Sequence, residues 1–168
     1  MPPIFIRKTN CPHSGWLSNM SPYKIVVDDI FWKTAEAYFQ SLRFASDDAV
    51  REMIRMQKSP IAAKMVAKQN RSRMVVVPMS EQDVENMRIT LRLKFKCNQI
   101  PLEDNLLLTG TRTIIEDCSG RRTDSGAFWG AAELPNGLLY GQNRLGKLLM
   151  ELRSEIKIDR QIKSNKID

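Results

Sequence analysis

The feature that most constrains this fold is a helical pattern near the C-terminus. Apolar side chains recur at helical spacing, at Leu145, Leu148, Leu149, Leu152 and Ile156. The pattern therefore predicts a helix over residues 144–158 that buries one stripe. At 168 residues the chain is long enough to bury a substantial core. We expect one domain, residues 1–158, followed by a polar tail, residues 159–168, that frays.

The other elements are predicted from caps and periodicity. Thr34, Ser46, Ser59 and Ser80 are the expected helix N-caps, and Asp83 completes a capping box with the last of them. We expect helices over residues 35–45, 47–57, 61–69, 81–97 and 101–109, strands over 4–7, 23–28, 30–33, 112–116 and 138–140, and an extended piece over 74–77. The strands over 23–28 and 30–33 are expected to form a hairpin around Asp28 and Asp29. The predicted fold is α+β, compact and mostly helical, with a small β-sheet.

The net charge of +7 is a second constraint. The basic residues fall into two clusters, Lys64, Lys68, Arg71 and Arg73, and then Arg88, Arg92, Lys94 and Lys96. Such a balance favours polyanionic partners or phosphorylated substrates, although both clusters can equally be solvated helix faces. No zinc-finger or RNP signature is present, so the charge predicts affinity for nucleic acid and not sequence specificity.

Several function classes are disfavoured. The apolar runs are too short to span a bilayer and no signal peptide opens the chain, so we expect no membrane role. Three cysteines without metal-like spacing indicate reduced thiols in a cytoplasmic protein. The only histidine, His13, is interpreted as a surface-loop residue, and we expect neither a metal nor a cofactor. Phosphate-loop, dinucleotide-binding and nucleophile motifs do not occur.

Three polar residues line up on the helix predicted to follow Thr34. Glu36, Gln40 and Arg43 stand at i, i+4 and i+7, next to an apolar stripe that faces the core. A carboxylate, an amide and a guanidinium in one line can act on a polar substrate, and the helix dipole favours the charged form of Glu36. The alternative is a half-exposed polar edge that only supports the helix start.

A second candidate region covers residues 128–147. Asn143 is expected to cap the following helix through its side chain, and helix N-termini attract anions. Trp129 can stack on a base or plug the core. The preceding loop, residues 119–126, holds two arginines and a candidate acid, Asp124, which suits a phosphate or a lid but is also ordinary surface composition. This region predicts a pocket for a flat, phosphorylated ligand.

Six blocks of sequence follow one another in an order that is specific. They are residues 15–22 (Gly-Trp-Leu-Ser-Asn-Met-Ser-Pro), 34–40 (Thr-Ala-Glu-Ala-Tyr-Phe-Gln), 94–95, 106–110, 128–130 and 143–153. Together they resemble the signature blocks of the NADAR, or YbiA-like, family and cover about residues 15 to 156. The resemblance implies a compact, mostly helical α+β fold and a hydrolase that cleaves N-glycosidic bonds.

The resemblance also implies roles for single residues. Glu36 matches the family's signature acid, and we expect it to stabilise positive charge at C1′ of the ribose or to deprotonate the attacking water. Arg43 stands where the family usually has Lys and would pair with a phosphate. The substrate-binding residues are expected to be Asn19, Gln40, Arg43, Trp129, Gly130, Asn143 and Gly146.

Two positions depart from the family pattern. Many members carry Asp three residues before the Trp-Gly pair, where this chain has Gly126. Either Asp124 fills that catalytic role, or Glu36 works without it. Many members also have Trp where this chain has Met79, and the lost stacking surface argues against a small pyrimidine base.

These observations favour an N-glycosidase that removes ADP-ribose from ADP-ribosylated guanine in nucleic acid, a reversal of ADP-ribosylation. One alternative is an N-glycosidase of early riboflavin-biosynthesis intermediates. Another is a non-catalytic module that binds ADP-ribose or NAD. The expected partners are ADP-ribosylated DNA or RNA, or a phosphorylated ribosyl small molecule, together with an ADP-ribosyltransferase that makes the modification.

Overall fold

The computed structural model describes residues 1–121 and 124–166. The chain divides into two compact units. We call Thr9–Cys97 the inner unit, and Met1–Lys8 together with Asn98–Asp168 the terminal unit. The expected α+β, mostly helical fold is confirmed. Within the described residues the β structure consists of three two-stranded pairs and one isolated bridge between Asp117 and Ala131. None of the helices in this part of the chain has the length and apolar character that crossing a membrane requires.

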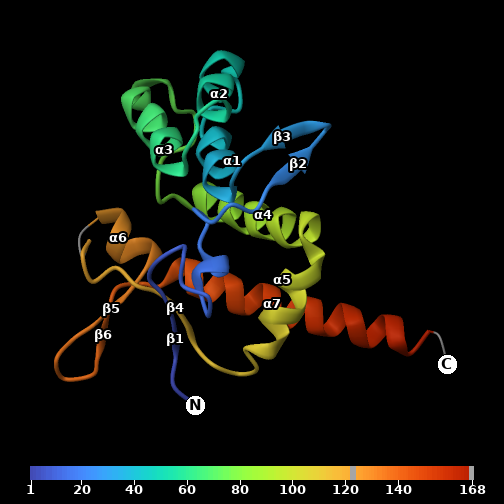
Figure 1. Cartoon of the computed structure of the whole chain (residues 1–168). Coiled ribbons are helices and arrows are strands. Elements are labelled where there is room, and N and C mark those ends of the chain that lie inside the picture. The colour runs from blue at the N-terminus through green and yellow to red at the C-terminus, as the bar shows by residue number, and fades with distance from the viewer. Residues whose placement is uncertain (122–123, 167–168) are drawn as a thin grey trace. The chain divides into compact units, whose positions relative to one another are not determined.

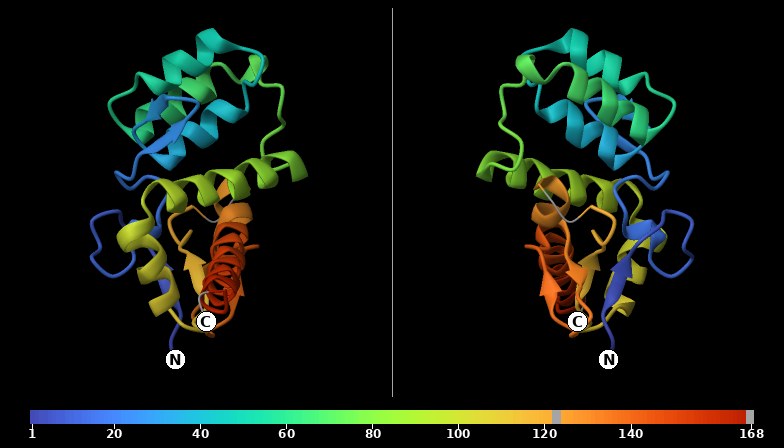
Figure 2. Two further views of the ribbon diagram at one scale, coloured as in Figure 1. Left: turned by 90° about the vertical axis from the view of Figure 1, so that its right-hand side faces the viewer. Right: turned by 90° about the vertical axis from the view of Figure 1, so that its left-hand side faces the viewer.

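The inner unit is built around helix α1 (Ala35–Leu42). This helix packs against α2 (Asp48–Arg55), α3 (Pro60–Gln69) and α4 (Glu81–Cys97) (Figure 1). Figure 2 shows α1, α2 and α3 as one packed group in both side views. Because α1 is surrounded on several sides, its polar residues become buried together with its apolar ones.

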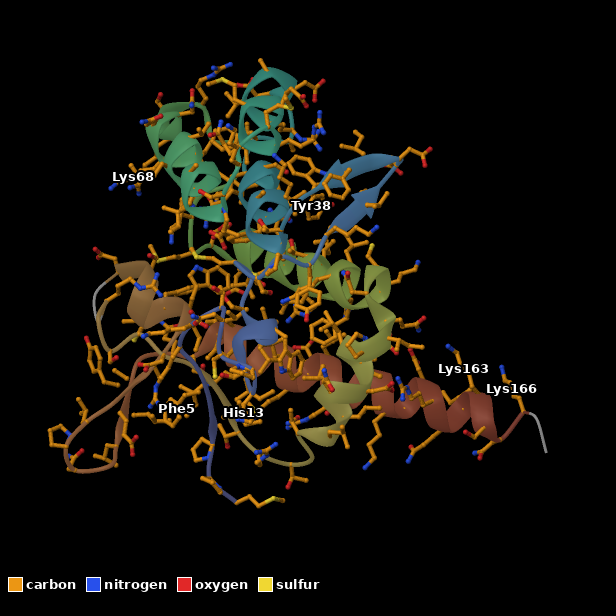
Figure 3. The ribbon with its side chains drawn as sticks, viewed as in Figure 1. Phe5, His13, Tyr38, Lys68, Lys163 and Lys166 are labelled. Carbon is orange, nitrogen blue, oxygen red and sulfur yellow. The ribbon has the colours of Figure 1, made fainter. Side chains whose placement is uncertain are left out.

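A two-stranded hairpin completes the inner unit. β2 (Ile25–Val27) pairs antiparallel with β3 (Ile30–Trp32), and the turn residues Asp28 and Asp29 have φ angles of 49° and 61°. The predicted hairpin is confirmed, since short polar residues can adopt the left-handed conformation that a two-residue turn needs. Tyr38 of α1 points toward this hairpin (Figure 3), and its ring lies edge-on to that of Trp32 with 5.5 Å between centroids.

Three of the four predicted N-caps, at Thr34, Ser59 and Ser80, are confirmed, and the fourth is shifted. Thr34 and Ser59 accept backbone N–H groups at 3.2 Å and 3.1 Å through their side chains. The cap of α2 is Asp47 rather than Ser46, because the carboxylate reaches the first turn at 3.2 Å. Residues 74–77 form no strand: Met74 has the expected extended backbone, but Val75 and Val76 are bends.

The terminal unit is organised by helix α7 (Arg144–Ser164). It packs against β4 (Ile114–Glu116), α5 (Gln99–Leu108) and α6 (Asp124–Trp129). β1 (Ile4–Ile6) pairs in parallel with β4, and the register places Ile4 opposite Ile114 and Ile6 opposite Glu116. The stripe predicted from the sequence is buried in full, at Leu145, Leu148, Leu149, Leu152 and Ile156.

Two predicted boundaries in this unit are wrong. The last helix does not end near residue 158 but continues to Ser164, so residues 159–164 are helical. The helix can continue because these residues include neither Gly nor Pro. In addition, Arg160 forms an ion pair with Asp104 of α5 at 2.7 Å. Residues 124–126, expected in a loop, begin α6, while Arg122 and Thr123 of that loop, and residues 167–168 of the tail, lie outside the described residues. A short β5–β6 pair, Ala132–Glu133 with Leu139–Tyr140, follows α6.

Candidate functional site

Glu36 is a buried carboxylate in the first turn of α1, with 7% of the residue exposed. Its Oε1 accepts a hydrogen bond of 2.8 Å from Nε2 of Gln40, one turn further along. Its backbone N–H donates to the carbonyl of Asn19 at 2.9 Å. The position near the helix N-terminus favours the negative charge. Glu36 is therefore fixed through both main chain and side chain, and it does not lie on the half-exposed edge that was the alternative interpretation.

The hydrogen bonds continue from Gln40 to Arg43 and Asp83. Nη1 of Arg43 donates to Oε1 of Gln40 at 2.9 Å. Nε and Nη2 of Arg43 donate to the two oxygens of Asp83 at 2.8 Å and 2.7 Å, a bidentate ion pair. The predicted line of three residues is thus extended by a fourth, Asp83, which is 0% exposed. A direct contact of Arg43 with a phosphate stays a prediction, and it would use N–H groups that Asp83 and Gln40 do not engage.

From the sequence, Asp83 is predicted only as part of a capping box. The Ser80 half of that box is present, because Oγ of Ser80 accepts from the backbone N–H of Asp83 at 3.3 Å. The carboxylate, however, accepts from the backbone N–H of Met79 at 2.8 Å and from Arg43. Its role in the site depends on a partner 40 residues away in the chain, which the local pattern does not reveal.

Asn19 lies beside this line with 5% of the residue exposed. Its Nδ2 faces Sδ of Met87 at 2.9 Å, and its Oδ1 is buried without a hydrogen-bond partner. A buried acceptor without a partner is unusual, because an unpaired buried polar atom costs about 1–3 kcal/mol. The amide oxygen of Asn19 is therefore a candidate contact for an O–H or N–H group of a ligand.

The loop that carries Asn19 is held by Lys94. Nζ of Lys94 donates to the carbonyls of Trp16 at 2.7 Å and Ser18 at 2.8 Å, and it lies 3.2 Å from Oγ of Ser21. Lys94 is 0% exposed, so its expected membership of a basic surface cluster is wrong. Its ammonium group instead fixes η1 (Gly15–Leu17) and the residues that lead to Asn19.

In the terminal unit, Asn143 has a different role from the one predicted. It occupies the N-cap position of α7 with φ 50°, but its side chain makes no capping hydrogen bond. Its Oδ1 accepts from the backbone N–H of Glu116 at 3.0 Å, and its Nδ2 donates to the carbonyl of Ile114 at 2.8 Å. The prediction of side-chain capping is wrong because β4 supplies both partners, and Asn143 joins the helix start to that strand.

Two glycines let the same segments approach closely. A Cβ at Gly146 would collide with the carbonyl of Ile114 and with the side chain of Asn143. A Cβ at Gly130 would collide with the carbonyl of Glu116, and the Gly130 carbonyl accepts from the backbone N–H of Asn143 at 2.9 Å. Gly130, Asn143 and Gly146 are therefore brought together around the end of β4.

Trp129 and Asp124 occupy the two ends of α6. Trp129 is half-buried, and its ring lies edge-on to that of Phe128 with 5.0 Å between centroids. Asp124 is exposed, with φ 46° at the start of the helix. A Cβ at Gly126 would collide with the carbonyl of Arg121, so a side chain at the position of the family's acid requires a backbone shift. His13 is exposed in a loop, as expected (Figure 3).

Comparison with known proteins shows what this chain is similar to. The sequence matches the NADAR domain over residues 4–157. It is 36% identical to the N-glycosidase YbiA of Shigella boydii over 87% of this chain and 84% of that protein. It is 31% identical to a riboflavin biosynthesis protein of Vibrio vulnificus over 92% of this chain and 39% of that protein. The NMR structure of Escherichia coli YbiA aligns with a TM-score of 0.73 and 34% identity, covering 96% of this chain and 89% of that one.

A buried carboxylate on a small, mostly helical α+β fold, in a chain similar to N-glycosidases along most of its length, defines a hydrolase that acts on N-glycosyl compounds. The chain belongs to the NADAR family, and the resemblance inferred from its six sequence blocks is confirmed.

Proposed function

We propose that this enzyme removes ADP-ribose from ADP-ribosylated guanine in nucleic acid. Hydrolysis breaks the bond between C1′ of the ribose and a nitrogen of the base. Water supplies the hydroxyl group to C1′ and a proton to the departing base. The observation that carries the proposal is the buried carboxylate of Glu36, held on one oxygen by Gln40 at 2.8 Å. The modified guanine would be produced by an ADP-ribosyltransferase, which we propose as the functional partner.

Glu36 is our proposed catalytic residue. As the C1′–N bond lengthens, positive charge develops on the ribose, and a fixed carboxylate stabilises that charge or takes a proton from the attacking water. Asn19 is proposed to accept a hydrogen bond from a ribose hydroxyl or a base amino group, because its buried Oδ1 has no protein partner. We retain Gln40, Arg43, Trp129, Gly130, Asn143 and Gly146 as proposed substrate-binding residues, and Asp124 as a second candidate acid.

A basic segment supports nucleic acid as the substrate. It consists of Lys64 and Lys68 of α3 with Arg71 and Arg73 of η2 (Arg71–Arg73). Lys68 is exposed and points away from α1 in Figure 3. The backbone N–H of Val75 donates to the carbonyl of Arg43 at 2.9 Å, so this segment runs directly to the end of α1. Glu36 lies about 10 Å away along that helix, at about 1.5 Å per residue.

The test of the catalytic step uses a guanine-containing oligonucleotide that carries ADP-ribose. We expect the wild-type protein to release ADP-ribose and Glu36→Gln to be slower by about 100-fold or more, because the amide cannot act as a base or carry a negative charge. Glu36→Gln preserves the hydrogen bond from Gln40. The matched control is Glu52→Gln, which removes an exposed carboxylate of α2 that pairs with Arg55 at 2.6 Å. Equal release by wild type and Glu36→Gln would exclude Glu36 from the reaction.

The role of the basic segment is tested with the double variant Lys68→Glu and Arg71→Glu. We expect weaker binding of the modified oligonucleotide and a smaller dependence of its KM on salt, because fewer counterions are released. Turnover of a short ADP-ribosylated guanosine should be unchanged. Lys157→Glu with Lys163→Glu makes the same change of charge on α7 and serves as the control. An equal loss of oligonucleotide binding in both double variants would show that binding depends on the net charge of the protein and not on the basic segment.

The second candidate is hydrolysis of early riboflavin-biosynthesis intermediates. It is favoured by the similarity to a protein named for riboflavin biosynthesis. Both substrates present a phosphorylated ribose joined to a base nitrogen, so the same carboxylate would serve either reaction. Efficient turnover of the pyrimidine intermediates, with no release of ADP-ribose from modified DNA or RNA, would replace the first proposal by the second.

A further inference from the structure

Asp83 is a fully buried carboxylate that the proposed reaction does not use directly. It lies in the first turn of α4 and is 0% exposed. Its oxygens accept from Nε and Nη2 of Arg43 at 2.8 Å and 2.7 Å and from the backbone N–H of Met79 at 2.8 Å. A buried ion pair is weak support for stability by itself, because desolvation of both charges offsets most of their attraction. Stability alone therefore does not explain why the ion pair between Asp83 and Arg43 lies at this position.

The pair determines which way the amide of Gln40 faces. A guanidinium has N–H donors and no acceptor, so the atom of Gln40 that faces Arg43 must be the oxygen. The observed distance from Nη1 to Oε1 is 2.9 Å. The amide nitrogen is then left to donate to Oε1 of Glu36 at 2.8 Å. Arg43 thus sets the hydrogen bond that Glu36 receives, and Asp83 holds Arg43 in place through two further bonds.

We propose that Asp83 is a positioning residue for the carboxylate of Glu36. It orients Arg43, Arg43 orients the amide of Gln40, and that amide fixes one oxygen of Glu36 so that the other is directed to the substrate. This proposal rests on the proposed function of Glu36. It also assigns Arg43 chiefly to the orientation of Gln40, because its guanidinium donates twice to Asp83 and once to Gln40.

The first variant is Asp83→Asn, which keeps the shape of the side chain and removes its charge. We expect kcat on the ADP-ribosylated oligonucleotide to fall about 10- to 100-fold, because a misplaced catalytic group loses about that much. KM should change by less than about twofold, since Asp83 does not touch the substrate. Asp48→Asn removes an exposed carboxylate that pairs with Arg51 at 3.3 Å and should leave kcat unchanged.

A double-variant cycle separates positioning from a general loss of structure. In a Gln40→Met background the connection to Glu36 is already broken, so Asp83→Asn should then lower kcat by less than about twofold. Asp83→Asn should still lower the free energy of unfolding in the Gln40→Met background, because the ion pair between Asp83 and Arg43 does not require Gln40. Equal reductions in kcat with and without Gln40 would overturn the proposal. If Asp83→Asn does not fold, Arg43→Lys serves instead, because lysine keeps the charge beside Asp83 but cannot reach Gln40 at the same time.

A measurement without substrate keeps this inference separate from the proposed function. The side-chain amide signals of Gln40 in an NMR spectrum are identified by their loss in Gln40→Met. We expect Asp83→Asn and Arg43→Lys to shift these signals and to speed their exchange with water, while Asp48→Asn leaves them unchanged. Unaltered signals in both variants would refute the positioning role. If the wild-type protein does not act on the ADP-ribosylated oligonucleotide but the variants show the expected shifts, the proposed substrate is refuted. The proposal that Asp83 positions Glu36 then stands.

Discussion

Lys94→Met tests whether a single buried ammonium group holds the loop that carries Asn19. Nζ of Lys94 lies 2.7 Å and 2.8 Å from the carbonyls of Trp16 and Ser18, with longer contacts of 3.3 Å to the carbonyl of Leu17 and 3.2 Å to Oγ of Ser21. An ammonium has three N–H donors, so it can satisfy most of these acceptors together. Methionine has a similar length and keeps the packing of the aliphatic part, but it cannot donate.

The expected loss of stability follows from these distances. A hydrogen bond to a charged group contributes about 1.5–3 kcal/mol net of exchange with water, so the two short bonds together contribute about 3–6 kcal/mol. The removed charge no longer has to be desolvated, which favours the lower end of that range. We therefore expect the free energy of unfolding to fall by about 3 kcal/mol, with the acceptors of Trp16 and Ser18 left buried without their donor.

Urea unfolding followed by circular dichroism measures this loss. Lys96→Met is the matched control, because Lys96 lies on the same helix and is exposed, and it should change the free energy of unfolding by less than about 0.5 kcal/mol. The fluorescence of Trp16, whose ring lies 6.3 Å from that of Phe95, should change only in Lys94→Met. A loss below about 1 kcal/mol, or one equal to that of the control, would refute the reasoning.

Two further predictions concern the core of each unit. Burial raises the pKa of Tyr38 above its ordinary value of 10.0, with Arg51 lowering it and Asp28 raising it to smaller extents. The stabilisation from neutral Tyr38 is therefore complete below pH 10.0 and is lost as pH rises through the folded-state pKa, so urea titrations above pH 10.0 should show a steeper loss for wild type than for Tyr38→Phe. Gly146→Ala should lower the free energy of unfolding by about 1–3 kcal/mol, because the added methyl collides with surrounding atoms. Thermal unfolding should show almost no change for Gly120→Ala, because a Cβ added there meets no atom of the described residues within 4 Å. Equal melting temperatures for the two variants would contradict this account of the close approach at Gly146.

Much of the fold could be predicted because it depends on short-range signals. The cap at Thr34 needs only a hydroxyl and the first turn that follows it. The stripe of α7 needs only the spacing of its leucines. The hairpin around Asp28 and Asp29 needs only two residues that tolerate positive φ. In each case the residues that make the interaction lie within a few positions of one another.

The parts of the site that could not be predicted depend on contacts between distant residues. Lys94 meets the carbonyl of Trp16 across 78 positions, and nothing in a run of basic residues marks one of them as buried. Asn143 was interpreted as a cap because Asn precedes a helical pattern, yet its side chain bonds to Ile114 and Glu116 at the end of β4. The preference of Asn for N-cap positions correctly predicted where α7 begins. It predicted the wrong partner for the side chain of Asn143, because β4, which is distant in sequence, binds the same amide.

The structure changes how the absence of the family's acid at Gly126 is interpreted. From sequence, Gly126 could have been an acid lost by simple substitution, with Asp124 as its replacement. In the structure a Cβ at Gly126 would collide with the backbone of Arg121, so this backbone does not accommodate an acid at that position. Asp124 is exposed and belongs to the start of α6, whereas Glu36 is buried and held by Gln40 at 2.8 Å. Since a carboxylate stabilises developing positive charge best where water is excluded and its position is fixed, these two environments favour Glu36 as the acid that acts at C1′.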